Sequence, residues 1–206
     1  MFLAKKIKNK LLLPSDLRPL IEEEAYSDLR PYIEAVEATS RISYKSIYII
    51  DYHKMNFLYM SDNSLFLCGE KAEEVLRKGY RFYFSHVPKD DLKFLADVNQ
   101  AGFDFFRDIT IANRARCSIS FNFHLYQDKR SDKVLINHQI TPLKLDRAGN
   151  IWLALCVVSL APSQETGVAY ITRIDTNCMW KLTRKSLGWK DVESVVLSEH
   201  EKSNYE

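Results

Sequence analysis

The chain has 206 residues, 46% of them hydrophobic, and a formal net charge of only +2. That apolar content is enough to bury a core, so we expect a soluble globular protein. Basic and acidic side chains are mixed along the sequence, which excludes the extended basic surface that attracts proteins to nucleic acid.

The cysteines and the N-terminal segment indicate the compartment. The four cysteines are widely spaced, which favours reduced thiols over a disulfide framework. Lysines are frequent before residue 11, but only a short leucine run follows them and no small-residue cleavage site is present. We therefore expect a cytoplasmic protein that does not enter a membrane.

Two short helices are predicted between residues 15 and 41, a segment rich in helix formers and interrupted by Pro19 and Pro31. Each proline fits best in the first turn of a helix, where its missing N–H is not needed. The second helix, residues 31–41, carries an apolar stripe. The stripe consists of Tyr32, Ile33 and Val36. It can pack on the sheet of its own chain or on a second copy of the protein.

The next stretch predicts a hairpin followed by helices. Residues 46–51 and 56–61 are apolar, β-branched and aromatic runs with a polar region between them, which is typical of two antiparallel strands. Residues 62–78 predict two short helices separated by a break at Gly69, and Gly79 is a typical helix stop.

The longest helix is predicted to begin near Pro88. Proline suits a first helical turn, and Asp90 and Asp91 complement the helix dipole there. Apolar side chains then recur at helical spacing, namely Leu92, Leu95, Val98, Phe103 and Phe106.

Three long strands are predicted in the second half of the chain. Residues 117–125 alternate between apolar and polar side chains, as expected of a strand near a sheet edge. Residues 133–160 read as two strands joined at the turn 146–150, and every residue from Ile151 to Val158 is apolar. Such a strand needs cover on both faces and is therefore central. Alternation places Trp152, Ala154, Cys156 and Val158 on one of its faces.

The order of strands and helices predicts an α+β domain over residues 46–161, with an antiparallel sheet and helices grouped on one face. Beyond Pro162 a polar linker is followed by a second small hairpin, formed by residues 168–174 and 179–182 around a turn at 175–177.

Few motifs suggest chemistry. The six glycines are scattered singly, so neither a dinucleotide-binding nor a Walker-type loop is present. No histidines or cysteines occur at metal-ligand spacing, and we expect no cofactor and no metal. His138 and Cys156 lie on neighbouring strands and could form a thiolate with its base. A buried histidine and an inert buried thiol explain them more simply, so no catalytic residue is predicted.

Several aromatic side chains can either line a small-molecule cavity between helices and sheet or simply fill the core. These are Phe103, Phe105, Phe106, Phe121, Phe123 and Trp152.

The segments HVPKDDL, at the start of the long helix, and LKLDRAGNIWLAL, a hairpin with a D-x-x-G-N turn, resemble a PAS domain over residues 46–161. The resemblance implies a five-stranded antiparallel sheet with helices on one face, the last strand central and the third at the edge. N-terminal helices in residues 1–45 and a linker hairpin in residues 162–196 would flank it. Both strand positions agree with the burial patterns above.

More narrowly, SIYIIDYHKMNFLYMSDNSLFLCG, NQAGFDFF and INHQITPLKLDRAGNIWLALCVVSL are similar to the sensory region of PAS-containing LuxR-type transcription regulators. Residues 197–206 begin with LSEHEK, which resembles the opening of the LuxR-type helix-turn-helix domain, although His200 stands where arginine is usual. The rest of that domain would follow residue 206, so we expect DNA contact only through a domain that this chain lacks.

The resemblance implies a non-catalytic sensory and dimerisation module that relays the binding of a small ligand or a partner to a DNA-binding domain. A homodimer is expected, with the stripe at Tyr32, Ile33 and Val36 as its contact. The ligand-binding candidates are Phe121, Phe123, His138, Trp152 and Cys156. Two alternatives remain: a ligand-free scaffold for protein interactions, and a small α+β enzyme using His138 and Cys156.

Overall fold

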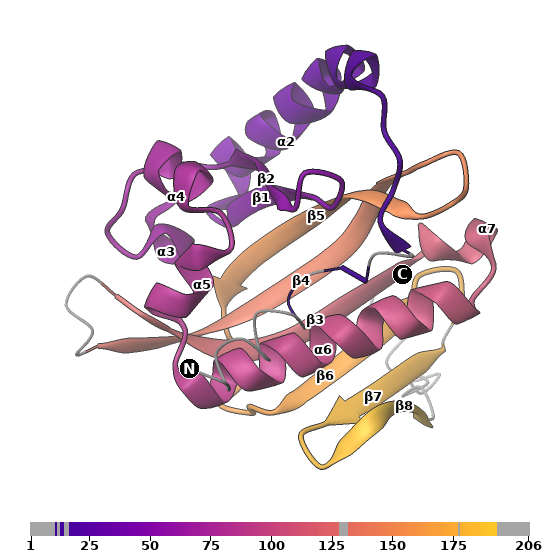
Figure 1. The fold of residues 1–206 in the computed structure, drawn as a ribbon. Coiled ribbons are helices and arrows are strands. Elements are labelled where there is room, and N and C mark those ends of the chain that lie inside the picture. Colours follow the sequence, from indigo (N-terminus) through magenta and orange to yellow (C-terminus); the bar gives the residue numbers. More distant parts are fainter. Residues whose placement is uncertain (1–10, 12, 15–16, 128–131, 177, 193–206) are drawn as a thin grey trace, which may run out of the picture.

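The computed structural model describes residue 11 and residues 13–14, 17–127, 132–176 and 178–192. Its strands form one antiparallel sheet in the order β2-β1-β5-β4-β3-β6-β7-β8 (Figure 1). Their bounds are β1 Ser46–Asp51, β2 Asn56–Met60, β3 Cys117–Tyr126, β4 Lys133–Leu145, β5 Ile151–Leu160, β6 Val168–Arg173, β7 Met179–Thr183 and β8 Ser186–Val192.

The helices occupy the N-terminal part of the chain and the connection between β2 and β3. They are the 3-10 helix η2 Glu23–Leu29 and the α-helices α2 Arg30–Ser43, α3 Ser64–Leu67, α4 Ala72–Lys78, α5 Arg81–His86, α6 Lys89–Asp108 and α7 Ile111–Arg114. Within the described ranges, none is both long enough and apolar enough to cross a membrane.

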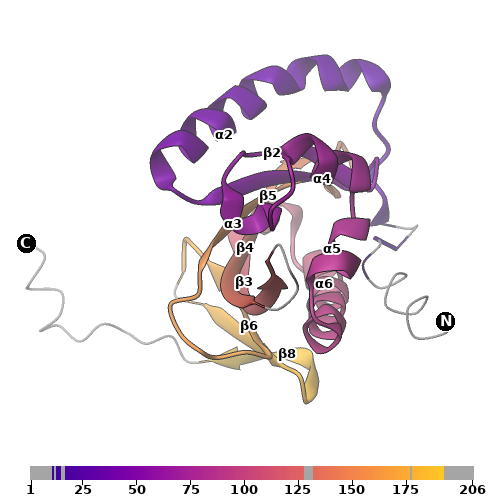
Figure 2. The same ribbon diagram turned by 90° about the vertical axis from the view of Figure 1, so that its left-hand side faces the viewer.

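The first five strands have the PAS-like order β2-β1-β5-β4-β3, with β5 between β1 and β4. The prediction of an α+β fold with a central last strand is therefore confirmed. Every residue of β1 is buried, because the main core lies on one face of the sheet and a second cluster lies on the other. Helices α3 to α6 contribute to the main core, and α2 packs over the opposite face beside β1 (Figure 2).

The prediction that residues 117–125 form an edge strand is wrong. β3 pairs with β4 on one side and with β6 on the other, and the hydroxyls of Ser118 and Thr172 lie 3.0 Å apart across the second pair. The segment expected as a linker hairpin thus continues the sheet, and β8 extends it by a strand that the sequence did not indicate. Alternation reports which face of a strand is wet, but it does not report whether the backbone edge is paired.

The predicted face of Trp152 is also wrong. Pairing between β4 and β5 shifts register near Pro142 and Lys144, so alternation along β5 is interrupted there. Ala154 keeps its place in the main core, whereas Trp152 packs on the opposite face with the N-terminal helices. Its ring meets that of Tyr26 edge-on at 5.4 Å between centroids.

The helix predictions are confirmed in part. Pro31 lies at the start of α2, and α6 is the longest described helix. The first N-terminal helix is instead a 3-10 segment that begins after Pro19 and runs directly into α2. The short helices α5 and α7 were not predicted. The regulator-like opening at residues 197–206 lies outside the described residues.

The hairpin β7–β8 packs on the outer side of α6. Trp189 donates its indole N–H to the carbonyl of Ala101 at 2.9 Å, and the rings of Phe105 and Trp180 meet at 4.9 Å. This docking makes the C-terminal strands part of the same packed body as α6.

Buried Asp91 ties this hairpin to the start of α6 and to β3. Its carboxylate accepts hydrogen bonds from the backbone and ring nitrogens of His124, at 2.9 and 2.7 Å, and a further one from the guanidinium of Arg184. Burial alone would raise the pKa of Asp91, but these hydrogen bonds lower it below its usual value. The carboxylate is therefore charged near neutral pH.

Gly79 offers a direct test of the backbone between α4 and α5. Its φ is +54°, and a Cβ placed there would lie 2.4 Å from Oδ1 of Asn56. We expect Gly79→Ala to lower the free energy of unfolding by about 2–3 kcal/mol, because it combines backbone strain with a steric clash. Urea denaturation measures this change.

The matched control is Gly188→Ala in β8, where an added Cβ meets nothing within 4 Å. Its stability should stay within about 0.5 kcal/mol of the parent. Equal stabilities for the two variants would contradict the described backbone at Gly79.

Candidate functional site

An internal cavity of about 40 Å³ lies between the sheet and helices α5 and α6. The strands supply aromatic and aliphatic side chains together with a histidine, α5 supplies a tyrosine, and α6 supplies a leucine and an asparagine. Two further tyrosines come from the connections after β1 and before α5. The lining residues are Leu11, Ile50, Tyr52, Tyr80, Tyr83, Leu95, Asn99, Phe121, His138 and Ile140.

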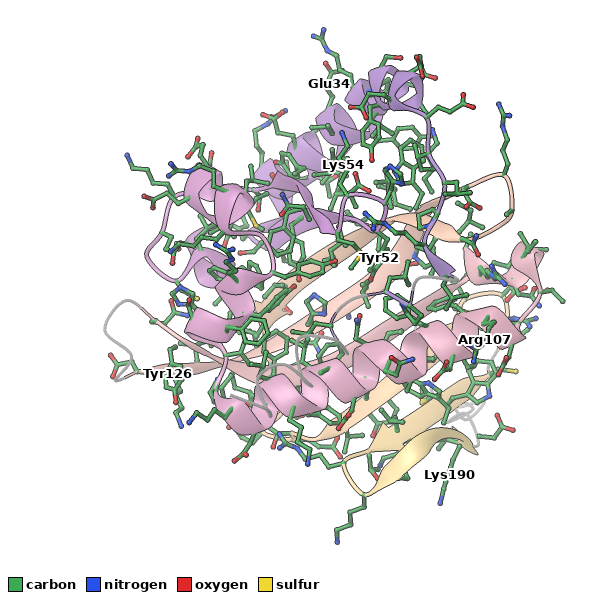
Figure 3. All side chains as sticks on the ribbon, viewed as in Figure 1. Glu34, Tyr52, Lys54, Arg107, Tyr126 and Lys190 are labelled. Atoms are coloured by element: carbon green, nitrogen blue, oxygen red, sulfur yellow. The ribbon has the colours of Figure 1, made fainter. Side chains whose placement is uncertain are left out.

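A second cavity, of about 30 Å³, adjoins the first along α6. The two share Tyr52, Asn99 and Ile140 as lining residues, so these side chains divide one interior space. Tyr52, which is labelled in Figure 3, follows β1. Its ring meets that of Phe103 of α6 edge-on, with 5.3 Å between the centroids. Each cavity alone holds little more than a water molecule or two.

A chain of buried polar groups reaches the cavity wall. The hydroxyl of Tyr48, from β1, lies 2.7 Å from the hydroxyl of Tyr83 and 2.6 Å from Nε2 of His138. If the Tyr48 hydroxyl donates to Nε2, the neutral imidazole of His138 carries its proton on Nδ1. If Nε2 instead donates to Tyr48, Nδ1 has no proton and can only accept a hydrogen bond. In either arrangement Nδ1 of His138 has no hydrogen-bond partner among the described residues.

Burial determines the charge state of these hydrogen-bonded side chains. It lowers the pKa of His138 from 6.5 to about 3, so the imidazole is neutral at physiological pH. It also raises the pKa of the Tyr48 hydroxyl well above its usual range. The site is therefore uncharged, and its polar groups act only as hydrogen-bond donors and acceptors.

The structure places His138 and Cys156 on the same face of the sheet, through the pairs of His138 with Val158 and of Ile140 with Cys156. Burial raises the pKa of the Cys156 thiol far above its usual range, and Cys156 is fully buried. A neutral thiol beside a neutral imidazole lacks the exposed, electropositive surroundings that activate a cysteine. The geometry gives no support to a nucleophilic pair.

The predicted ligand-binding residues separate into three groups. Phe121 and His138 line the cavity, with ring centroids 5.2 Å apart. Phe123 and Cys156 are buried on the same face behind them, with Phe123 stacked on Phe121 at 5.6 Å. Trp152 lies on the opposite face of the sheet, away from this group.

Sequence reasoning missed Tyr48 and Tyr83. Tyr48 stands between Ile47 and Ile49 in a buried strand. A buried tyrosine there needs a partner for its hydroxyl, which is a signal that the sequence does carry. Tyr83 gave no such signal because α5 was not predicted. Within the described residues no group of three or more potential metal ligands comes together.

The predicted dimer stripe is divided between two environments. Val36 is buried against the sheet of its own chain, and Ile33 packs partly on the same cluster. Tyr32 remains 37% exposed, and at the C-terminal end of α2 Ile42 and Tyr44 are 78% and 90% exposed.

Comparisons with known proteins bear on the fold. Neither a protein-family model nor a curated protein matches the chain. Among solved structures, it is similar to a PAS domain from Colwellia psychrerythraea at 16% identity, covering 65% of this chain and 96% of that one, with a TM-score of 0.44. A light-oxygen-voltage domain studied with a flavin analogue matches at 21% identity, over 63% and 86%, with a TM-score of 0.45.

A phage VqmA–DPO complex is also similar, at 15% identity and a TM-score of 0.40, covering 66% of this chain and 56% of that one. At these identities the likeness concerns the fold alone. The function is inferred below from the geometry of the site.

Protonation provides a test of the buried imidazole. Between its folded pKa of about 3 and its unfolded value of 6.5, His138 binds a proton only in the unfolded chain. Stability should therefore fall as the pH drops below about 6.5, and this group alone contributes about 1.4 kcal/mol per pH unit. In His138→Gln that contribution should disappear. Urea denaturation between about pH 7 and pH 5 measures it.

Above about pH 7 the stabilities of the two proteins should run parallel, because neither side chain changes charge there. Equal slopes for the parent and the variant below that pH would show that His138 is accessible to protons in the folded state.

Proposed function

We propose that the chain is the non-catalytic sensory module of a LuxR-type transcription regulator and that it binds a small, mainly apolar ligand in the cavity beside α6. The observation that carries this proposal is Nδ1 of His138, which has no hydrogen-bond partner among the residues that the structure describes. A buried polar group without a partner costs about 1–3 kcal/mol, and a ligand with one hydrogen-bonding group would remove that cost. The neutral cavity and its aromatic walls favour an uncharged or only partly polar body in contact with Phe121 and Tyr83.

The size of the cavity constrains the ligand. Because the two cavities measure about 40 and 30 Å³, anything larger than a few atoms must displace Tyr52, Asn99 or Ile140. The small volume equally favours the second candidate, a ligand-free PAS scaffold that acts through protein contacts. The role in transcription rests on the sequence resemblance, including the regulator-like opening at residues 197–206.

Native mass spectrometry of the purified chain, followed by denaturation of the same sample, distinguishes these two functions. We expect a dimer that releases a copurified small molecule. In His138→Leu, ligand occupancy should fall about tenfold, because the hydrogen bond to the ligand is lost. The exposed-cysteine variant Cys178→Ser serves as the control and should retain the ligand. An unliganded dimer would favour the ligand-free scaffold over the ligand sensor. An unliganded monomer would contradict both proposed functions.

We further propose that α2 carries the homodimer contact. The exposed side chains of Tyr32 and Ile42 in α2, and of Tyr44 directly after it, would meet a second copy. Val36 anchors the helix on its own sheet. In a two-fold symmetric homodimer each substitution is present in both copies, so its effect on the interface occurs twice. We expect Ile42→Ser to raise the dimer dissociation constant about tenfold or more.

Sedimentation velocity measures this change. Ile174→Ser, at a side chain 88% exposed after β6, removes the same apolar group elsewhere and should leave the dimer unchanged. Equal effects of the two substitutions would place the contact outside α2.

A further inference from the structure

An open cleft of about 420 Å³ lies directly outside the internal cavity. The connection between β1 and β2, the C-terminal end of α4 and the start of α5 form its walls. Its lining residues are Leu11, Lys54, Met55, Asn56, Arg77, Lys78, Gly79, Tyr80, Arg81 and Phe84. Leu11 and Tyr80 line both the cleft and the internal cavity, so these two side chains form the partition between them.

Four cationic side chains line the cleft, and none of its lining residues in the described part of the chain is a carboxylate. The cations are Lys54, Arg77, Lys78 and Arg81. Three of these cations have carboxylate partners that lie outside the lining: Lys54 pairs with Glu23 at 2.9 Å, Arg77 with Glu74 at 3.9 Å, and Lys78 with Glu70 at 2.6 Å. Arg81 forms no ion pair within the described part of the chain.

Helix capping accounts for only part of this charge. Arg77 and Lys78 occupy the last turn of α4, where cations complement the helix dipole. Lys54 and Arg81 belong to other elements and gain nothing from that dipole. Cations from three parts of the chain thus surround one hollow, and for Arg81 the described residues provide no ion-pair partner.

One of the two residues that separate the cleft from the cavity, Leu11, comes from the N-terminal segment. Leu11 is buried, and the amide of Asn99 donates to its carbonyl at 3.1 Å. Asn99 itself lines the internal cavity, so one α6 side chain contacts both the cavity and the residue that closes it. Displacement of the Leu11 and Tyr80 side chains would join the apolar cavity to the basic cleft.

We propose that the basic cleft binds the anionic end of a small organic carboxylate, whose apolar body passes Leu11 and Tyr80 into the internal cavity. This inference rests on the proposed ligand-sensing function and narrows its ligand class. The ligand carboxylate meets Arg81, which has no ion pair among the described residues, while the interior supplies the apolar contacts. An uncharged ligand would form no ion pair with the cations of the cleft.

The test compares three probes of equal length and different charge: 3-phenylpropanoate, 3-phenylpropan-1-ol and 3-phenylpropylammonium. Isothermal titration calorimetry on the whole chain measures their affinities. We expect the carboxylate to bind about fivefold or more tightly than the alcohol, and the ammonium to bind most weakly. Arg81→Gln should remove the advantage of the carboxylate and leave the alcohol unchanged. Arg147→Gln, which removes one exposed positive charge from the turn between β4 and β5, is the matched control.

Each outcome separates the two proposals. If the alcohol binds as tightly as the carboxylate, or if Arg81→Gln has no effect, the cleft does not select an anion and only the ligand class is overturned. If the carboxylate binds and responds to Arg81→Gln but not to His138→Leu, the anion sits in the cleft without entering the cavity, which overturns the single continuous site. If no probe binds, the inference fails, and the outcome of native mass spectrometry alone decides the sensor function.

Discussion

The burial of β1 and β5 on both faces is the constraint on which the rest of the structure depends. An apolar strand between two others in a sheet must be covered twice, because each face removes alternate side chains from water. Helices α3 to α6 supply one layer, in which α5 and α6 line the cavity, while η2 and α2 supply the other. The N-terminal helices are therefore part of the fold, and a dimer formed through α2 would use the outer side of a helix whose inner side is already committed.

The same burial determines the chemistry of the site. Tyr48 and His138 lie at the centre of the sheet, where desolvation keeps one protonated and the other neutral. Such groups hold their protons across the physiological range, so they suit recognition by hydrogen bonding better than acid–base catalysis, which needs a pKa near the working pH. The buried Cys156 follows the same rule.

The sequence predicted those features that depend on one strand or helix at a time. The two-sided burial of β5, the first hairpin, the long helix and the chemical character of His138 and Cys156 all follow from local pattern. Three features depend on a partner strand or helix: the pairing of β6 with β3, the register shift that turns Trp152 to the opposite face, and the meeting of Tyr48 with Tyr83. The register shift lies beside Pro142, which has no N–H for a regular ladder. The sequence shows that proline but does not show which residue lies opposite it.

Helix α6 connects the cavity with the C-terminal strands. Leu95 and Asn99 face the cavity, while Ala101 and Phe105 contact the hairpin β7–β8. Strands β4 and β5 are hydrogen-bonded on both sides, so the sheet resists displacement. The helix is held by side-chain packing, by the cluster at Asp91 in its first turn and by the hydrogen bond from Trp189 to the carbonyl of Ala101. If a ligand larger than the cavity binds, it would displace α6 more readily than the sheet, and the hairpin β7–β8 packs on that helix.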